Sequence, residues 1–224
     1  MTAFRFKKFV VEQDLCAMKV GTDGVLLGAW ATGGTRVLDI GTGTGIIALM
    51  LAQRCPQAQV TAIDIDEGAV RQASHNVAQS PFADRIEVLH ESVQDFDGAD
   101  GGFDAIMSNP PFFIDSLNAP DRQRNIARHA ETLTYGQLMQ AAWRLLADGG
   151  EFSVVVPFDY RQRMEDEATF VGFFPSRVYA VRTSARKPAK RFLLAFRKHP
   201  CPCERTEITL GDEAYTLLTK DFYL

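Results

Sequence analysis

Four consecutive residues, Asn109-Pro110-Pro111-Phe112, follow an apolar segment and have the types needed to activate an aromatic amine. The exocyclic nitrogen of adenine is a weak nucleophile, because its lone pair is delocalised into the ring. The side-chain oxygen of Asn109 and the backbone carbonyl of Pro110 could accept from its two N–H groups and draw the nitrogen toward sp³ geometry. Prolines fix φ and add no competing donor, so both acceptors would be rigid. With Phe112 stacked on the base, positioning would supply most of the rate, without a metal or strong base.

A glycine-rich turn, Gly41-Thr42-Gly43-Thr44-Gly45, follows a short apolar segment that contains Asp39. Glycines let a ligand approach the backbone closely, at a helix N-terminus beside the carboxyl ends of strands. A dinucleotide fingerprint requires G-x-G-x-x-G, and here Ile46 stands where its third glycine belongs. The G-x-G-x-G spacing resembles the S-adenosylmethionine (SAM) loop of class I methyltransferases. Asp64, at the expected end of the next strand, should then accept hydrogen bonds from the ribose hydroxyls.

The resemblance to class I methyltransferases implies further contacts with SAM. Asp39 would lie near the methionine end, and Ser92 and Val93 near the adenine. Members of that class often have an acid at the position of Ser92, so backbone groups would have to bind the adenine amino group here. We expect Ile65, directly after the ribose-binding acid, to belong to the same site.

Residues 19–23 could close over the methionine carboxylate of SAM, with Thr22 and Asp23 at the start of a short helix. The positive end of the helix dipole would favour that carboxylate. Capping of the helix explains Thr22 and Asp23 equally well, because both are common N-cap types.

Apolar segments alternate with helical patterns from residue 36 onward, which indicates βαβ units and a mostly parallel sheet. We expect strands at residues 36–40, 59–64, 85–90, 103–108, 151–156, 177–181 and 191–196. We expect helices at about 25–30, after the N-cap types Thr22 and Asp23, and at 46–54, 67–79, 134–146 and 159–171. Asp66 should cap the third of these helices, and Gly149-Gly150 should end the fourth.

The last two expected strands are separated by too few residues for a helical crossover, so they should pair antiparallel. The predicted fold class is α/β, a Rossmann-like class I SAM methyltransferase with seven mostly parallel strands, an antiparallel last strand and helices on both faces. Residues 207–210 could form a short edge strand. We expect one domain over residues 1–224, with an N-terminal extension and helix at 1–35, a SAM-binding catalytic core at 36–198 and a C-terminal edge segment at 199–224.

Composition excludes several classes of protein. The 224 residues are 46% hydrophobic, enough for a sizeable core. They contain no apolar run of about 18 residues and no signal-peptide pattern at the N-terminus, so we expect no membrane span and a cytoplasmic location. The four cysteines lack the paired spacing of a zinc site, so we expect reduced thiols and no metal.

Positive charge is concentrated in one part of an acidic chain. The net charge is −4, yet residues 177–198 include eight Lys and Arg and no acid. Arg186, Lys187, Lys190 and Arg191 lie on or beside the connection between the last two expected strands. They could bind phosphates, although a solvated hairpin is an equally good interpretation.

The chain resembles the bacterial tRNA (adenine-N6)-methyltransferases that modify adenine 37 of valine tRNA. Nearly the whole chain carries this resemblance, in segments 4–30, 37–54, 109–113, 124–135, 187–196 and 218–224. It implies SAM as cofactor, tRNA as partner and an anticodon-loop adenine that is extruded to reach the site. It also implies RNA contacts from the basic hairpin and from Pro111 and Phe113, while 124–129 could order on RNA or stay a solvated loop. We favour a monomer.

Three other functions share part of this pattern or of this fold class. Protein-glutamine N5-methyltransferases share the Asn-Pro-Pro-aromatic motif, but they usually have Tyr where Phe112 stands and a helical domain before the SAM core. A non-catalytic SAM- or RNA-binding protein would not require the intact motif. An NAD-linked dehydrogenase conflicts with the glycine spacing.

Overall fold

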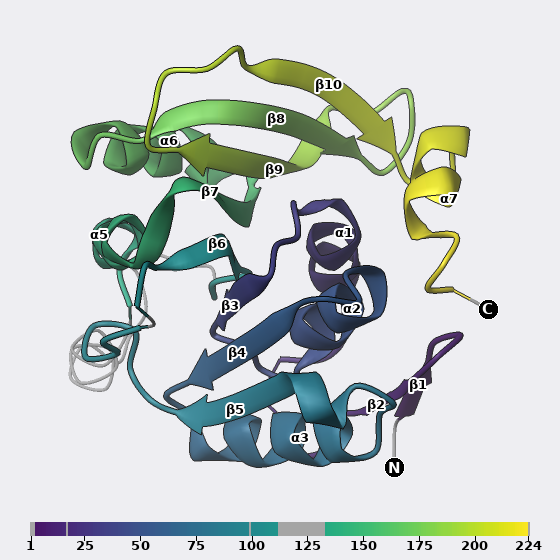
Figure 1. Cartoon of the computed structure of the whole chain (residues 1–224). Coiled ribbons are helices and arrows are strands. Elements are labelled where there is room, and N and C mark those ends of the chain that lie inside the picture. Colours follow the sequence, from purple (N-terminus) through teal and green to yellow (C-terminus); the bar gives the residue numbers. More distant parts are fainter. Residues whose placement is uncertain (1–2, 17, 99, 112–132, 224) are drawn as a thin grey trace, which may run out of the picture.

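The computed structural model describes residues 3–16, 18–98, 100–111 and 133–223 (Figure 1). Within these residues, eight strands form one sheet in the order β10-β8-β9-β7-β6-β3-β4-β5, and a short hairpin forms a separate pair. The sheet strands are β3 (Arg36–Ile40), β4 (Gln59–Asp64), β5 (Ile86–His90), β6 (Phe103–Ser108), β7 (Leu146–Pro157), β8 (Phe174–Arg182), β9 (Ala189–Arg197) and β10 (Glu204–Thr209). The hairpin strands are β1 (Ala3–Arg5) and β2 (Val10–Glu12).

The described helices cover both faces of the sheet (Figure 1). The α-helices are α1 (Thr22–Trp30), α2 (Ile46–Arg54), α3 (Glu67–Ala78), α5 (Tyr135–Leu145), α6 (Arg161–Phe170) and α7 (Glu213–Thr219), and the 3-10 turns are η1 (Ala83–Arg85) and η2 (Phe158–Tyr160). Asp66 caps α3 as predicted, because its carboxylate accepts from the backbone N–H of Gly68 at 2.8 Å. Thr134 and Gln137 form a capping box at the start of α5.

Parallel pairing brings the carboxyl ends of the central strands to one edge of the sheet. β3 pairs in parallel with β4 and β6, β4 with β5, and β6 with β7. The glycine turn follows β3, Asp64 ends β4, and Asn109 follows β6 at this edge. Ligands of open α/β sheets bind here, so the fold collects the chemistry-bearing segments in one place.

The predicted antiparallel strand is confirmed as β9, which runs antiparallel to both β7 and β8. The predicted count of seven is one strand too low. The short edge strand expected at 207–210 is confirmed as β10, which begins three residues earlier, pairs in parallel with β8 along six residues and forms an edge of the sheet. This pairing buries Ile208, which explains why the segment joins the sheet.

Two predictions of helix ends are wrong. The N-cap of α1 is Gly21, and Thr22 and Asp23 already belong to the helix, because the Asp23 carboxylate binds Arg191 of β9 instead of capping. Gly149-Gly150 does not end α5. That helix ends at Leu145, and both glycines lie in β7, whose first residue Leu146 pairs with Phe103 of β6.

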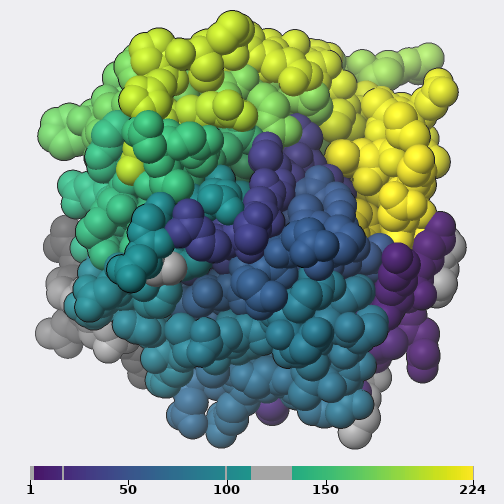
Figure 2. Space-filling view, viewed as in Figure 1, coloured from purple at the N-terminus to yellow at the C-terminus, as the bar shows by residue number. Residues whose placement is uncertain are grey.

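Two apolar clusters fix the layers. α1 and α2 are buried along almost their whole length and pack on one face of the sheet. α5 and α6 contribute to the cluster on the opposite face. The two ends of the chain meet on the first face, where Phe4 and Phe6 contact Tyr223 at ring-centroid distances of 6.2 and 6.1 Å. Figure 2 shows the purple N-terminal hairpin against the yellow C-terminal segment.

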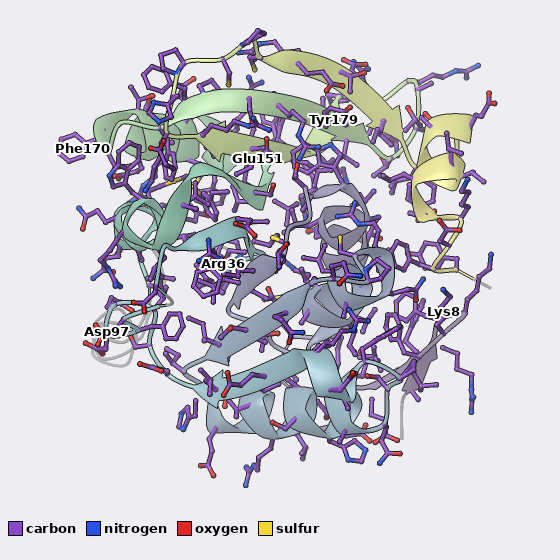
Figure 3. The ribbon with its side chains drawn as sticks, viewed as in Figure 1. Lys8, Arg36, Asp97, Glu151, Phe170 and Tyr179 are labelled. Atoms are coloured by element: carbon purple, nitrogen blue, oxygen red, sulfur yellow. The ribbon has the colours of Figure 1, made fainter. Side chains whose placement is uncertain are left out.

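A buried carboxylate joins strands at the edge of the sheet opposite to the glycine turn. Glu151 is 2% exposed and lies in β7 (Figure 3). It accepts from Thr32 and Ser176 and forms ion pairs with Arg177 and Arg197. Burial alone raises the pKa of Glu151, but the hydrogen bond from Thr32 and the charge of Arg177 outweigh it and hold that pKa below its usual value. Glu151 therefore links the segment after α1 to β7, β8 and β9.

Candidate active site

The turn between β3 and α2 has the backbone that its glycines predict. Gly41, Gly43 and Gly45 have φ angles of 70°, 57° and 80°, a left-handed region that favours glycine. The N–H of Gly43 donates to the Asp64 carboxylate at 2.9 Å. The turn is thus tied to the end of the neighbouring strand, and Gly41 is left exposed at the surface.

Asp39 is fully buried beneath this turn. Its Oδ2 accepts from the Thr42 hydroxyl at 2.7 Å, whereas its Oδ1 has no partner of good geometry in the described part of the chain. Burial raises the pKa of Asp39 to about 7, and the charge of Asp64 adds to this, although Thr42 and the nearby N–H of Ala48 oppose it. An unpaired, buried carboxylate oxygen is costly unless a ligand supplies the missing partner.

Asp64 is the last residue of β4 and lies at the carboxyl edge of the sheet, where the other residues predicted to bind the ribose and adenine of SAM also lie. It also accepts from the N–H of Asp66 at 3.0 Å, which fixes the carboxylate. The next residue, Ile65, is an apolar side chain that is 54% exposed. Ser92 and Val93 follow β5 at this edge, where Ser92 caps a turn by accepting from the N–H of Gln94.

The start of α1 lies against the Asn109-Pro110 segment that follows β6. A Cβ on Gly24 would be 3.9 Å from the Asn109 Nδ2 and 3.4 Å from a methyl group of Ile46, the first residue of α2. Asn109 is half-buried and Pro110 is buried. The Asn109 Oδ1 is covered and has no hydrogen-bond partner among the residues with described positions. Asn109 therefore lies against the start of α1, with an amide oxygen that is not used by the described residues.

An N-terminal arm, residues 12–16 and 18–20, lies across the glycine turn, a contact that the sequence did not reveal. Asn76 of α3 exchanges two hydrogen bonds with the backbone of Glu12 and donates a third to the carbonyl of Thr44. Gln72 accepts from the N–H of Leu15. The only sequence signal was two amides, four residues apart, on the otherwise apolar face of α3.

Two sulfur side chains of this arm reach the site. The Cys16 thiol would lie 3.7 Å from a Cβ on Gly43, and the Met18 sulfur is 4.0 Å from the Asn109 Nδ2. Burial raises the pKa of Cys16, and the nearby charge of Asp64 also raises it. A neutral thiol and a thioether are thus the groups that the arm places over the turn.

The basic hairpin is divided by the structure. Arg186, Lys187 and Lys190 are exposed in and beside the connection between β8 and β9. Arg191 is half-buried, and its Nε is 2.8 Å from the Asp23 carboxylate at the start of α1. The first three can meet a ligand directly, whereas Arg191 also connects the hairpin to α1.

A family model described as "Methyltransferase small domain" matches residues 20–172 of the chain. A curated protein of Phocaeicola vulgatus is 48% identical to the chain and one of Bacteroides fragilis is 47% identical. Each match covers 99% of this chain and 97% of the relative, and both relatives are named tRNA1(Val) (adenine(37)-N6)-methyltransferase. The chain belongs to the tRNA1(Val) (adenine(37)-N6)-methyltransferase family.

A solved structure shows the same fold as this methyltransferase. The structure, described as a predicted O-methyltransferase from Agrobacterium tumefaciens, has a TM-score of 0.68 at 18% identity. The match covers 89% of this chain and 96% of that one. The class I fold predicted from the alternating strands and helices is thus confirmed, apart from the additional strand β10.

SAM is the cofactor of this methyltransferase, and its residues fit that molecule. The space beyond Gly41 is open, because none of the described atoms lies within 4 Å of where its Cβ would be. The unpaired Asp39 Oδ1 can receive the cationic methionine end, Asp64 the ribose hydroxyls, and the exposed Ile65 can cover the adenine. Thr22 is the exposed first residue of α1.

Several predicted residues cannot be placed. Phe112, Phe113 and the segment 124–129 lie outside the described residues, whereas Pro111 is described and exposed.

None of the helices in the described ranges is long and apolar enough to cross a membrane. The same ranges hold no group of three or more His, Cys, Asp or Glu side chains with the geometry of a metal site.

Proposed function

We propose that this methyltransferase transfers the methyl group of SAM to N6 of an adenine in tRNA, namely adenine 37 of valine tRNA. The observation that carries the proposal is the unpaired Oδ1 of Asn109, a residue that lies against α1 at the edge of the sheet where the glycine turn lies. An acceptor held there without a partner suits a substrate N–H. The names of the full-length relatives supply the identity of the base and of the tRNA.

The residues of this chain act by binding and orienting. Asn109 Oδ1 and the carbonyl of Pro110 accept from the two N–H groups of the adenine N6, which directs its lone pair toward the cofactor. Bound SAM supplies an electrophilic methyl group on a sulfonium and leaves as S-adenosylhomocysteine. The nitrogen loses one proton to solvent after the new N–C bond has formed. Rigid acceptors and alignment account for most of the rate in such a site.

Recognition of the RNA is assigned to the exposed part of the basic hairpin, Arg186, Lys187 and Lys190, together with Pro111 and the undescribed Phe112 and Phe113. Positive side chains at the same edge as the acceptors suit phosphates on either side of an extruded base. We also propose that the protein acts as a single-domain cytoplasmic monomer.

The test is incubation of the protein with methyl-labelled SAM and, separately, unmodified valine tRNA, a DNA duplex and a glutamine-containing protein substrate. Nucleoside mass spectrometry should detect N6-methyladenosine in the tRNA alone. Label that appears only in the protein substrate would replace the proposal by glutamine methylation. Binding of SAM without transfer to any of the three would indicate a non-catalytic binding protein.

A further inference from the structure

A hollow of about 370 Å³ lies at the carboxyl end of β7, outside the cofactor site. Pro157, Phe158 and Asp159 form one side of it, and residues 188–191 of the basic hairpin form the other. Phe158 is 56% exposed, although phenylalanine is usually buried. Packing of the described residues does not require an exposed ring at this place.

The ring of Phe158 rests on a buried support. Its centroid is 6.0 Å from that of Phe192, which is 5% exposed. The guanidinium of Arg161 lies 4.4 Å from the Phe192 centroid and packs on the same ring. Pro157 fixes the backbone immediately before Phe158. The exposed ring is therefore held in position, as a stacking surface must be.

The hollow is close to the catalytic amide. Ser108 pairs with Val154, so Pro157 lies about two residue rises, ~7 Å, beyond the level of Asn109 along the neighbouring strand. A second link runs through α1, because Arg191 of the hollow binds Asp23 and the next residue, Gly24, adjoins Asn109. When the target base of an RNA strand lies at Asn109, the nucleotides on one side of that base extend over this hollow or in the opposite direction from Asn109.

We infer that Phe158 is a stacking platform for an unpaired base of the substrate RNA, next to the adenine that is methylated. This inference rests on the proposed function. Exposed aromatic rings beside positive side chains are the usual means of holding single-stranded nucleic acid. Lys190, exposed on the hairpin, meets the phosphate between the two nucleotides. Asp159, exposed on the rim, repels phosphate but accepts from a base N–H, so the edge of the stacked base faces Asp159.

The base on Phe158 is the neighbour of the target and not the target itself. The methylated adenine must donate its N–H groups to Asn109 Oδ1 and the carbonyl of Pro110, which follow β6, whereas Phe158 follows the neighbouring strand β7. One base cannot occupy both positions. The platform accordingly affects how RNA is held and leaves the transfer step to the motif at 109–112.

The experiment uses an unmodified anticodon stem-loop RNA of valine tRNA with 2-aminopurine on either side of the target adenine. Stacking on Phe158 should quench the fluorescence of one of these two probes when the protein binds. Phe158→Ala should abolish that quenching and raise the KM for the RNA about tenfold, with kcat at saturating RNA and SAM affinity unchanged. Phe158→Trp should retain wild-type KM and quenching, and Phe158→Leu should behave as the alanine variant.

Phe170→Ala is the matched control, because this phenylalanine is 83% exposed at the end of α6 (Figure 3) and does not line the hollow. It should not change KM or quenching. Wild-type KM and quenching in Phe158→Ala, with wild-type protein active on the RNA, would overturn the platform alone. A wild-type protein that neither binds nor methylates the RNA would overturn the proposed function and the platform with it.

Discussion

Replacing Asp39 by asparagine should remove a buried negative charge that lowers the free energy of unfolding near neutral pH. The pKa of Asp39 is about 7 in the folded chain, against 3.8 as the ordinary value, mainly because the carboxylate is buried. Between these pH values the folded state binds a proton that the unfolded state does not. The free energy of unfolding of the wild-type protein should therefore decrease as the pH rises from about 4 to about 7.

The magnitude follows from the size of the shift. Each pH unit in this window corresponds to 1.36 kcal/mol, so this group contributes a loss of about 2 to 3 kcal/mol between pH 5 and pH 7.5. Asp39→Asn should lack this contribution. The Thr42 hydroxyl can still donate to the amide oxygen, so the variant should fold. Its unpaired NH₂ group offsets part of the gain at pH 7.5, which makes the difference in pH dependence the quantity to measure.

The assay is urea unfolding of the wild-type protein and of Asp39→Asn at half-unit intervals from pH 5 to pH 7.5. SAM affinity, measured by calorimetry, provides a second readout, since a cation near Asp39 favours the ionised carboxylate. Wild-type affinity should fall about tenfold from pH 8 to pH 6, whereas the variant should bind more weakly and with less pH dependence. Parallel stability curves for the two proteins, or pH-independent SAM binding by the wild type, would refute the reasoning.

Three further substitutions probe the supports of the site. Asn76→Ala removes three hydrogen bonds to the N-terminal arm and the glycine turn, so it should lower the free energy of unfolding by about 2 kcal/mol and speed amide hydrogen exchange in the arm. Unchanged exchange would show that other contacts hold the arm in place. Gly45→Ala forces a side chain into a φ of 80°, with its Cβ 3.4 Å from Ala73, and should cost about 1–2 kcal/mol in urea unfolding; a neutral effect would mean that the turn can relax. Glu151→Ala leaves the Arg177 guanidinium without its carboxylate and should lower the free energy of unfolding by about 3 kcal/mol above pH 5. The cost should become smaller as the pH falls below 4.5, because the wild-type protein then loses the stability that its ionised Glu151 contributes. An equal cost at all pH values would contradict the ion pairing.

The sequence predicted the central sheet and the cofactor turn because those features depend on local patterns. Apolar runs bounded by glycine or proline gave β3, β4 and β6 with their correct ends, and the G-x-G-x-G spacing distinguished a SAM turn from a dinucleotide turn. The positive φ angles in that turn require glycine wherever the turn occurs. Such features need no knowledge of distant contacts.

Contacts between distant segments could not be predicted in the same way. The α1 cap was misassigned because Asp23, a good capping type, is bound by Arg191, 168 residues away. The glycines at 149–150 were expected to end α5, yet pairing with β6 draws them into a strand. Tertiary contacts commonly override local preference in this manner. Phe158 and the N-terminal arm were missed for the same reason, since their positions depend on the assembled sheet.

The most direct test of the acceptors at Asn109 and Pro110 is the single-turnover rate of methyl transfer to valine tRNA, with SAM and RNA saturating. Asn109→Ala should slow this step about 100-fold, and Asn109→Asp, which keeps an acceptor oxygen, should retain most of it, while both variants bind SAM as the wild type does. Equal rates for the wild type and Asn109→Ala would show that the amide oxygen does not activate the adenine amine.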